Sequence, residues 1–471
     1  MKEVNENIVE FIQKAKPALE KKISDTPSWL VTDEKGVEKV VAQKLAHVLM
    51  KEIPIIRVSS FSQGARFDKV TGTWRMDNLS EYLDSVITDE LESVGKWSQS
   101  KLAEVKRFIM IKTYDREAKS NPFDHSKPHL VSFKNGTYNF KTQQLQPHNP
   151  KDYIFQSHNF ELDINEEHLP TKTLSWLEEL TGDNTSAKYL IEMIGYCFYR
   201  SYAPFQSITI LIGAGGNGKS VFLNHLTKVL NDENVSNASL TDLGNKNNRF
   251  ATSMLYQKLA NIFADISADF IDSTGLLKAL TGNDMLFAEY KGQDPFMFKN
   301  FAKLIFSANT LPQFNDFSLG FDRRLYVVPF NVVIGKEFKQ KHDLKAIEQE
   351  IPQFAYYCLK AFSEAMERGQ LSLSEPMIKA KEEWLKEANH LSRFIDDYCR
   401  IDEEAKTGDS TRNIFDKYRD FCFDENIKSL SQPKFNRQLE NLGIIKKTIR
   451  QDNTRVARYI KLFLKNDYDL D

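Results

Sequence analysis

Four cysteines are few for a chain of 471 residues, and they stand far apart. Cys197, Cys358, Cys399 and Cys422 form no Cys-x-x-Cys pair, so the sequence indicates neither a zinc site nor a disulfide framework and fits a reducing cytoplasm. Apolar runs are also short, and none reaches the roughly 18 residues that a membrane span requires. The start of the chain is charged and amphipathic, without the apolar segment and cleavage site of a signal peptide. We therefore expect a cytoplasmic protein with no membrane partner.

The chain also lacks an excess of positive charge, because 63 Lys and Arg residues are set against 65 Asp and Glu residues. With a formal net charge of −2, it has no overall field that would attract a polyanion. Any binding of nucleic acid must then come from local basic surfaces. Hydrophobic residues make up 41% of the chain, which is enough for several cores, and the length suggests about three domains at roughly 150 residues each.

Residues 1–165 predict an N-terminal α+β domain. Helical patterns alternate there with two hairpin patterns, the first with a turn at Thr71-Gly72 and the second with a tight turn at Asn135-Gly136. This half of the chain carries no catalytic signature that we can identify. The expected helices cover 3–22, 38–52 and 78–118, and the expected hairpins cover 57–76 and 129–150.

Residues 166–340 predict an α/β domain built on a parallel sheet. Apolar spacing from 166 to 203 indicates a helical collar, and four strand-like apolar runs alternate with helical segments after it. We expect residues 341–400 to form a helical connector and residues 401–471 to form a compact basic domain. The four strand-like runs are Ser207–Ile212, Leu259–Ile266, Ala302–Asn309 and Arg324–Phe330.

The strongest motif follows the first of these runs. Residues 213–220 read Gly-Ala-Gly-Gly-Asn-Gly-Lys-Ser and match the phosphate-loop pattern G-x-x-x-x-G-K-[ST], with a helical pattern directly after them. The glycines let successive N–H groups point at phosphate oxygens, and the helix presents its positive end to the same anion. Lys219 is expected to reach the terminal phosphates and Ser220 to ligate Mg²⁺. A glycine-rich turn that binds nothing is the alternative.

The predicted ligands are therefore ATP and Mg²⁺. The residues expected around the nucleotide are Gly213, Ala214, Gly215, Gly216, Asn217, Gly218, Lys219, Ser220 and Val221.

Polar residues end the next two apolar runs. Asp265 ends the first, where a carboxylate can hold the metal or orient the attacking water, although a lone acid at such a place is often a solvated loop residue. Asn309 ends the second, where its amide can bond the water or the γ-phosphate, although Asn is also a common turn residue. Arg323 and Arg324 precede the last strand. They form either a surface ion-pair site or an arginine finger that reaches the ATP of a neighbouring subunit.

This order of motifs resembles the superfamily 3 helicases, which are AAA+ ATPases of viruses and mobile elements. The sequence is more closely similar to the phage and plasmid primase–helicase family, which is related to the poxvirus primase–helicase. Within that family it most resembles the replication initiator helicases of staphylococcal pathogenicity islands. The likeness covers most of the chain. Residues 57–160 resemble the region that precedes the family's motor, and the basic end resembles its C-terminal winged helix.

The resemblance implies an ATP-dependent DNA helicase and replication initiator that forms a homo-hexamer, unwinds origin DNA and works with host replication proteins. It implies an AAA+ phosphate-loop motor between an N-terminal α+β domain and a C-terminal winged helix. Lys219 and Ser220 match the family's phosphate-loop pair, Asp265 its acidic Walker B position, and Asn309 its sensor 1. Arg324 best matches the arginine finger, with Arg323 second.

One position departs from the family pattern. Family members often carry two adjacent acids in the Walker B strand, whereas Ala264 stands beside Asp265 here. Which group polarises the attacking water is therefore left open, with Asp269 a candidate if the chain folds it back. No primase signature is found, so priming is not implied.

A hairpin before sensor 1 is a candidate contact for single-stranded DNA. In superfamily 3 helicases such a hairpin projects into the central channel with a basic tip. Phe287–Lys299 reads as strand, tight turn, strand, with Lys291 beside Gly292 at the turn, and Lys299 is a further candidate. An ordinary solvated lysine is the alternative.

The basic end is a candidate contact for duplex DNA. Ten basic residues stand against two acidic ones from Lys428 to Lys465. Helical patterns at 411–426 and 432–441, followed by a hairpin that turns at Asp452-Asn453, predict a winged helix. A winged helix that binds protein is the alternative. The residues expected to contact DNA are Lys434 and Arg437 in the major groove and Lys446, Lys447, Arg450 and Arg455 on the backbone.

Two other functions fit the same motifs. One is a phosphate-loop ATPase that packages DNA or moves protein, which would hydrolyse ATP without unwinding a fork. The other is an origin-binding protein whose nucleotide only controls assembly, which would bind ATP without turnover.

Overall fold

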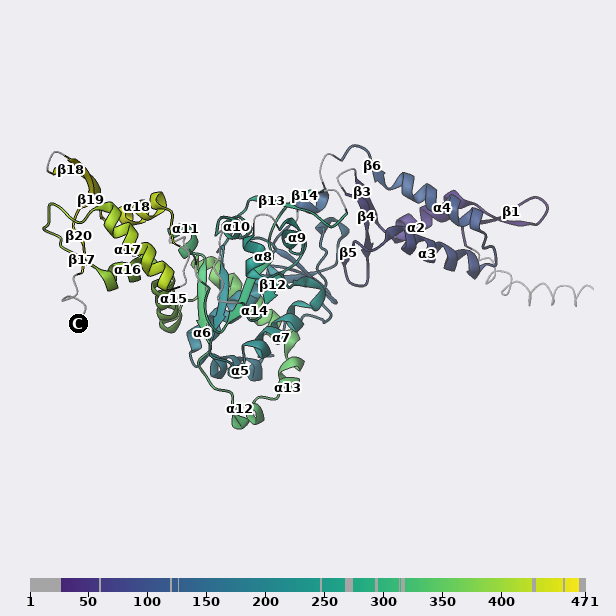
Figure 1. Cartoon of the computed structure of the whole chain (residues 1–471). Helices are drawn as coiled ribbons and strands as arrows, with labels where there is room; N and C mark the ends of the chain where they lie inside the picture. Colours follow the sequence, from purple (N-terminus) through teal and green to yellow (C-terminus); the bar gives the residue numbers. More distant parts are fainter. Residues whose placement is uncertain are drawn as a thin grey trace, which may run out of the picture. The chain divides into compact units, whose positions relative to one another are not determined.

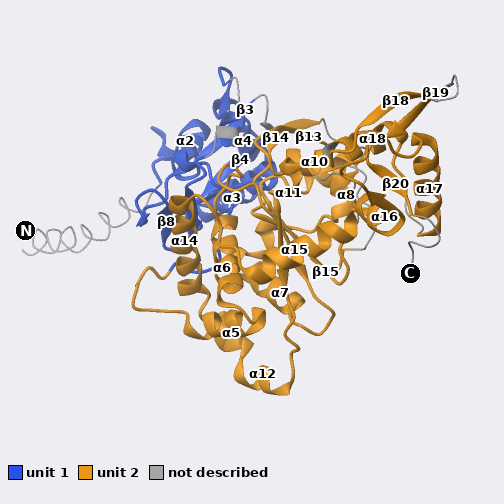
Figure 2. Cartoon of the chain, turned by 90° about the vertical axis from the view of Figure 1, so that its left-hand side faces the viewer, with its two compact units in different colours: residues 1–162 blue, residues 163–471 orange. Residues whose placement is uncertain are grey.

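The computed structural model of the chain divides into two compact units, Met1–Leu162 and Asp163–Asp471 (Figure 2). The helix expected at 3–22 lies outside the described residues. Among the residues that are described, no helix is both long and apolar enough to cross a lipid bilayer. The described residues are 27–58, 61–118, 121–125, 127–245, 248–266, 274–292, 295–312, 314, 318–425, 429–451 and 454–465.

Three helices form one part of the first unit: α2 (Ala42–Glu52), α3 (Leu79–Ser93) and α4 (Gln99–Lys112). Their apolar faces pack into one buried cluster with Trp29 and Val40. The helix expected at 38–52 is shorter, because its first residues form the strand β2 (Glu38–Val40), which pairs with β1 (Leu30–Thr32).

Two sheets form the other part of the first unit. The expected first hairpin is β4 and β5, which turn through Gly72 at a φ of 66°. The second hairpin is also present, but Phe133 pairs with Gly136, so its turn is Lys134-Asn135 and not Asn135-Gly136. The strands are β3 (Ile55–Val58), β4 (Phe61–Asp68), β5 (Thr73–Arg75) and β6 (Tyr114–Asp115) in one sheet and β7 (Leu130–Phe133), β8 (Gly136–Asn139) and β9 (Gln144–Gln146) in the other, with short 3-10 turns at Pro122–His125 and Pro150–Asp152.

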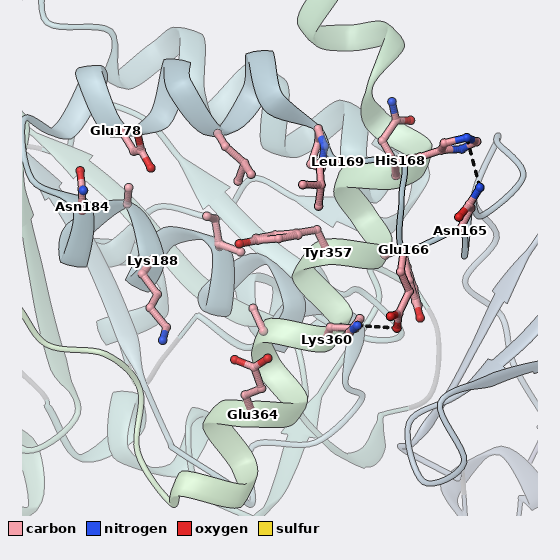
Figure 3. A pocket seen from close by; sticks show the side chains of 17 residues that line it. Asn165, Glu166, His168, Leu169, Glu178, Asn184, Lys188, Tyr357, Lys360 and Glu364 are labelled. Carbon is pink, nitrogen blue, oxygen red and sulfur yellow. Dashed lines mark hydrogen bonds and ion pairs between the residues drawn. The ribbon is translucent and has the colours of Figure 1, made fainter.

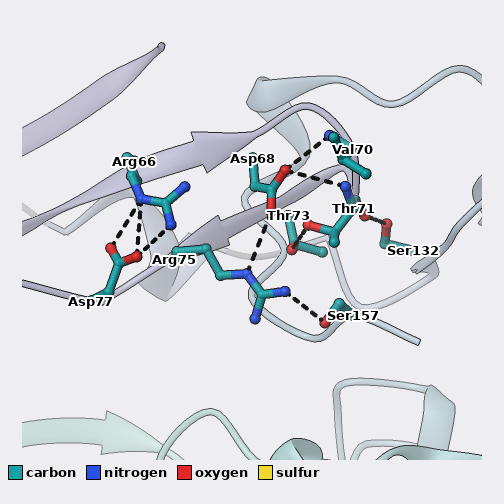
Figure 4. A network of polar contacts seen from close by, with 9 residues as sticks. All are labelled: Arg66, Asp68, Val70, Thr71, Thr73, Arg75, Asp77, Ser132 and Ser157. Carbon is teal, nitrogen blue, oxygen red and sulfur yellow. Dashed lines mark hydrogen bonds and ion pairs between the residues drawn. The ribbon is translucent and has the colours of Figure 1, made fainter. Parts of the chain in front are cut away.

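Polar contacts join these two sheets (Figure 4). The Ser132 hydroxyl on β7 donates to the Thr71 carbonyl at 2.9 Å. The Arg75 guanidinium on β5 lies 3.9 Å from the Asp68 carboxylate and donates to the Ser157 hydroxyl at 3.3 Å. The Ser132–Thr71 hydrogen bond therefore links the two sheets, and the Arg75 contacts join β5 to β4 and to the segment that bears Ser157.

A five-stranded parallel sheet forms the centre of the second unit (Figure 1). Its order is β11-β12-β15-β10-β16, so β15 lies between β10 and β12 although it follows both in the sequence. Parallel strands are buried on both faces, which explains the four apolar runs of the sequence. The strand β11 was not expected from the sequence. The strands are β10 (Ile208–Ile212), β11 (Val235–Ser236), β12 (Ala260–Phe263), β15 (Lys303–Ala308) and β16 (Leu325–Pro329).

Helices surround this sheet (Figure 1). Helix α6 is buried almost throughout and packs on α14 so closely that a Cβ on Gly195 would lie 2.1 Å from the Cys358 carbonyl oxygen. Trp384 of α15 donates to the Pro312 carbonyl at 2.9 Å. The helices are α5 (Thr171–Thr181), α6 (Asn184–Phe198), α7 (Lys219–Leu230), α8 (Leu240–Gly244), α9 (Arg249–Ser253), α10 (Thr274–Leu280), α11 (Leu319–Asp322), α12 (Lys336–Lys341), α13 (Leu344–Gln349), α14 (Ile351–Arg368) and α15 (Glu375–Ala388), with a 3-10 turn at Asp232–Asn234.

The C-terminal module has its own apolar core. This core includes Leu391 and Phe394, so the domain boundary expected at residue 401 cuts through it. The physical reason is that α16 packs its apolar stripe on α17, and the strand β17 that follows α16 pairs with β20. Lys428 and the turn Asp452-Asn453 lie outside the described residues. The elements are α16 (His390–Tyr398), β17 (Cys399–Ile401), α17 (Thr411–Asp424), α18 (Gln432–Asn441), β18 (Lys446–Gln451), β19 (Thr454–Tyr459) and β20 (Leu462–Leu464).

Candidate functional site

The glycine-rich loop joins the end of β10 to the start of α7. Gly215, Gly216 and Gly218 have φ angles of 24°, 74° and 82°, which an L side chain rarely adopts. A Cβ added to Gly215 or Gly216 would meet nothing within 4 Å, so this part of the loop faces open space. At Gly213 a Cβ would lie 2.3 Å from the Phe330 carbonyl oxygen. The loop therefore packs closely against the sheet on one side and leaves room for an anion on the other.

Asn217 holds the loop in this position. Its side chain is buried, and its Nδ2 donates to the Phe330 carbonyl at 2.6 Å. The N–H of Ile334 donates to the Gly216 carbonyl at 3.2 Å. Both contacts come from the segment after β16, so the strand beside β10 fixes the shape of the loop.

Lys219, Asn309 and Asp265 form a continuous row of polar contacts. The Lys219 Nζ lies 3.1 Å from Asn309 Oδ1 and 3.2 Å from Asn217 Oδ1. The Asn309 Nδ2 lies 3.4 Å from Asp265 Oδ1. Because β10, β15 and β12 are neighbours and parallel, their carboxyl ends meet at one edge of the sheet. The structure thus brings together three side chains that the sequence singled out separately.

The Lys219 ammonium is buried among these acceptors. Desolvation lowers the pKa of Lys219 from its usual value, and the negative charge of Asp265 opposes that shift. A buried ammonium beside an open loop is well placed to pair with phosphate. The charged phosphate oxygens would take the place of the neutral amide oxygens that now accept its hydrogen bonds, and a charged acceptor binds an ammonium more strongly.

Asp265 follows β12 in a left-handed backbone conformation with a φ of 59°. The Asp265 N–H donates to the Ser307 hydroxyl at 3.2 Å, and the Ile266 N–H donates to the Ser307 carbonyl at 2.8 Å. Ser307 of β15 therefore turns the chain so that the exposed Asp265 carboxylate lies at the edge with Asn309. Asp269, the other candidate acid, lies outside the described residues. The importance of Ser307 was missed in the sequence, although it immediately precedes the Ala308-Asn309 pair.

The residues present fit a magnesium ion that arrives with a nucleotide. The described parts of the chain contain no group of three or more His, Cys, Asp or Glu side chains able to hold a metal. Mg²⁺ commonly takes one or two protein ligands and completes its shell with phosphates and water. Ser220, exposed on the first turn of α7, and Asp265 are the side chains that would supply them.

The two arginines lie at the amino ends of the strands, opposite the carboxyl ends where the phosphate loop lies. Strand β16 runs parallel to β10, with Leu325 opposite Ile208 and Pro329 opposite Ile212. Arg323 and Arg324 precede β16, whereas the phosphate loop follows β10, so one strand length of about 16 Å separates them. The structure does not bring either arginine to the phosphate loop of its own subunit.

The two arginines also differ from each other. Arg323 is exposed and its Nη2 donates to the Gln206 side chain. Arg324 is only 8% exposed, and its Nε donates to the Thr281 hydroxyl at 3.0 Å. The sequence favoured Arg324 over Arg323 as the arginine finger. In the structure, Arg323 is the one that reaches the surface of the subunit.

The hairpin expected before Asn309 is present. Strands β13 (Met285–Ala288) and β14 (Phe296–Lys299) pair antiparallel, and Lys291 lies exposed in the turn beside Gly292, which has a φ of 77°. Lys299 is exposed but pairs with Met285, so it lies at the base of the hairpin and not at its tip. The connection between the strands is longer than the tight turn that the sequence predicted.

In the C-terminal module, two groups of basic side chains have different surroundings. Arg458 donates to the Gly408 carbonyl at 2.8 Å, and Lys465 donates to the Asp396 carbonyl at 2.8 Å, so both help to hold the module together. The side chains expected to contact DNA are exposed on α18 and on the β18–β19 hairpin: Lys434, Arg437, Lys446, Lys447, Arg450 and Arg455.

A separate cavity of about 400 Å³ lies between α5, α6 and α14 (Figure 3). At its rim the Lys360 Nζ lies 2.6 Å from the Glu166 carboxylate. Its lining includes Tyr357 and Lys188 but no residue of the phosphate loop. The cavity is therefore distinct from the candidate nucleotide site, and nothing in the sequence pointed to it.

Comparison with known proteins gives two matches to family models. Residues 211–324, which contain the phosphate loop, Asp265, Asn309 and both arginines, match a family described as a family of unknown function (DUF5906). Residues 26–182 match a family described as D5 N terminal like. The second match includes all of the described part of the first unit.

One curated relative is named "Putative helicase L207/L206" and comes from Acanthamoeba polyphaga mimivirus. It is 23% identical over 318 residues, which make up 62% of this chain and 33% of that protein. This chain thus spans about a third of the length of that relative. The D5-type match and the viral relative together support a relation to the phage and viral primase–helicase proteins.

Among solved structures, the A form apo structure of the NrS-1 C-terminal region is similar, with a TM-score of 0.47 and 17% identity. The likeness covers 88% of this chain and 98% of that one. A second apo structure of the same region, residues 305–718, gives a TM-score of 0.45 and 16% identity.

Proposed function

We propose that the chain is an ATP-dependent DNA helicase and replication initiator of a phage or mobile genetic element, with a motor of the superfamily 3, AAA+ type. The observation that carries this proposal is the row Lys219–Asn309–Asp265 beside an open glycine loop at the carboxyl edge of a parallel sheet. The strand that bears Asn309 lies between the strands that lead to Lys219 and Asp265. The relation to viral primase–helicase proteins supports the same conclusion.

Each polar side chain has a separate task in this proposal. Lys219 exchanges its amide acceptors for the terminal phosphate oxygens of ATP and stabilises the charge that develops on them. Mg²⁺, when bound, would neutralise negative charge on the phosphates. Ser220 and Asp265 are the side chains that would hold the metal and its water shell. The Asn309 amide, freed from Lys219, orients the attacking water.

The position of the arginines supports an assembly of several subunits. Since Arg323 and Arg324 lie about 16 Å from the loop of their own subunit, an arginine finger from this chain must act on a neighbouring nucleotide. An interface of this kind is heterologous and closes into a ring if the rotation between subunits allows it. A homo-hexamer, with one nucleotide at each interface, is the ring that we propose.

Two different surfaces would contact DNA. Lys291 at the tip of the β13–β14 hairpin would hold the backbone of a single strand in the central channel. The C-terminal module has helices α16, α17 and α18 and the basic hairpin β18–β19, and this order of elements supports the winged helix that we propose. In this proposal α18 enters the major groove of origin DNA with Lys434 and Arg437, and the hairpin holds the backbone.

The test is to measure ATP hydrolysis and the unwinding of forked DNA by the full chain, with and without single-stranded DNA. We expect ATPase activity that single-stranded DNA stimulates, and unwinding that requires ATP. Hydrolysis without unwinding would instead support a packaging or protein-moving ATPase. ATP binding without turnover would support an origin-binding protein whose nucleotide controls assembly. Either result would overturn the helicase proposal.

A further inference from the structure

The Arg324 guanidinium joins two segments that lie far apart in the sequence. Its Nε donates to the Thr281 hydroxyl at 3.0 Å, and its Nη1 donates to the Gly320 carbonyl of α11. Thr281 is completely buried, and its hydroxyl also donates to the Leu277 carbonyl at 2.8 Å. Thr281 is thus held by α10 and by Arg324 at once.

Thr281 lies at the base of the candidate DNA hairpin. It is the first residue after α10, and only three residues separate it from the start of β13 at Met285. Asn300, the first residue after β14, donates to the Leu280 carbonyl at 2.9 Å. The two ends of the hairpin are therefore joined at Leu280 and Thr281, and this junction is what Arg324 holds.

The neighbour of Arg324 in the sequence has a different position. Arg323 is exposed, and its partner Gln206 lies on the segment that enters β10. Both arginines lie in the turn between α11 and β16, where Arg323 caps the helix and stays exposed while Arg324 is buried. A displacement of Arg323 would pass to Arg324 through a single peptide unit.

We propose that Arg324 is a positioning residue that links the subunit interface to the base of the DNA hairpin, while Arg323 is the arginine that meets the nucleotide of the neighbouring subunit. This inference rests on the proposed function. When Arg323 moves toward or away from a neighbouring phosphate, Arg324 transmits the movement to Thr281 and so to β13. The link couples ATP hydrolysis to the position of Lys291.

The sharpest variant is Thr281→Val, because valine keeps the shape of threonine and removes the hydroxyl that Arg324 contacts. We expect basal ATP hydrolysis to continue, while its stimulation by single-stranded DNA and the number of base pairs unwound per ATP fall by about tenfold, within the usual range of coupling between sites. Thr281→Ser keeps the hydroxyl and should restore the coupling. Thr181→Val is the matched control, since Thr181 ends α5 with the same kind of bond, to the Leu177 carbonyl at 2.9 Å, and does not contact Arg324.

Three results would overturn the proposal. One is full coupling in Thr281→Val. Another is an equal loss in Thr181→Val, which would mean that any such substitution has this effect. The third is loss of basal hydrolysis in each of two single variants, Thr281→Val and Arg324→Lys. That result would make Arg324 part of the catalytic site. If the unchanged protein hydrolyses no ATP, the proposed function itself fails, and this outcome is distinct from the other three.

Discussion

The Lys219 ammonium donates to the Asn309 side chain at 3.1 Å, although the two residues are 90 positions apart in the sequence. The contact joins the loop after β10 to the end of β15, the strand beside it. Asn309 in turn contacts Asp265 at the end of β12. The catalytic groups that we propose therefore contact one another across the ends of three neighbouring strands.

Removal of the Lys219 charge should abolish hydrolysis. We expect Lys219→Ala to lower kcat by on the order of 10²–10³, because the ammonium stabilises charge on the transferred phosphoryl group. Steady-state ATPase assays and forked-DNA unwinding measure the effect, and circular dichroism checks that the fold persists. Lys228→Ala is the matched control on the same helix, since Lys228 pairs with Glu348 at the surface. ATPase near the wild-type rate in Lys219→Ala would refute the assignment of the site.

A nucleotide site shared between subunits should allow two inactive variants to complement each other. We expect Arg323→Ala to bind ATP but not to hydrolyse it, because its own loop is intact and its neighbour's finger is missing. Mixed with Lys219→Ala protein, it should regain part of the ATPase activity, since some interfaces then combine an intact loop with an intact arginine. The measurement is ATPase rate against mixing ratio at constant total protein. A flat, inactive series, from variants that still co-assemble, would contradict a shared site.

The channel hairpin and the C-terminal module should differ in the DNA that they bind. We expect Lys291→Ala to lose unwinding and to keep most of its duplex binding. The combined variant Lys446→Ala, Lys447→Ala, Arg450→Ala and Arg455→Ala should lose duplex binding and keep ATPase activity that single-stranded DNA stimulates. Its salt dependence of duplex binding should flatten by roughly one unit of slope for each side chain that no longer pairs with a phosphate.

Binding titrations over a range of salt, on duplex and on single-stranded DNA, measure both variants. Lys386→Ala provides a control for the loss of an exposed lysine on α15. Equal losses on both forms of DNA in both variants would mean that one continuous surface binds DNA.

The buried Lys303 should make stability depend on pH. Burial lowers the pKa of Lys303 to about 7, although its Nζ donates to the Tyr199 and Phe301 carbonyls at 2.7 and 2.8 Å. In the unfolded chain the pKa of a lysine is about 10.4, so between these values the unfolded state binds more protons and stability rises with pH. We expect the native protein to gain about 2 kcal/mol relative to Lys303→Met between pH 7 and pH 9. Urea unfolding of both proteins across this range measures the gain, and a constant difference would show that Lys303 titrates normally.

Sequence patterns predicted the parallel sheet well because its strands are apolar runs of four to six residues buried on both faces. They missed β11, which is only two residues long and has no pattern to recognise. They misplaced the turn of the second hairpin by one residue, because an Asn-Gly pair favours a turn but Gly136 pairs with Phe133 instead. The Asn135 side chain exchanges two hydrogen bonds with the Leu162 backbone, a contact between distant residues that local sequence does not reveal.

The sequence predicted the site residues that follow the end of a strand. It did not predict which way a side chain points. Lys219, Asp265 and Asn309 follow neighbouring strands, so their meeting follows from the topology of the sheet. Two adjacent arginines give no sign of which one points inward. The hydrogen bonds from Arg324 to the buried Thr281 hydroxyl and to the Gly320 carbonyl show that Arg324 is turned into the subunit.

The hydrogen bond from Asn217 to the Phe330 carbonyl has a thermodynamic consequence. Fixing the backbone of a residue costs about 1–2 kcal/mol of conformational entropy. Asn217 and its partner order the loop when the sheet forms. The entropy is therefore lost during folding and does not reduce the free energy of nucleotide binding. Asn217→Ala would move the cost to the binding step, so nucleotide would bind more weakly even though Asn217 need not touch it.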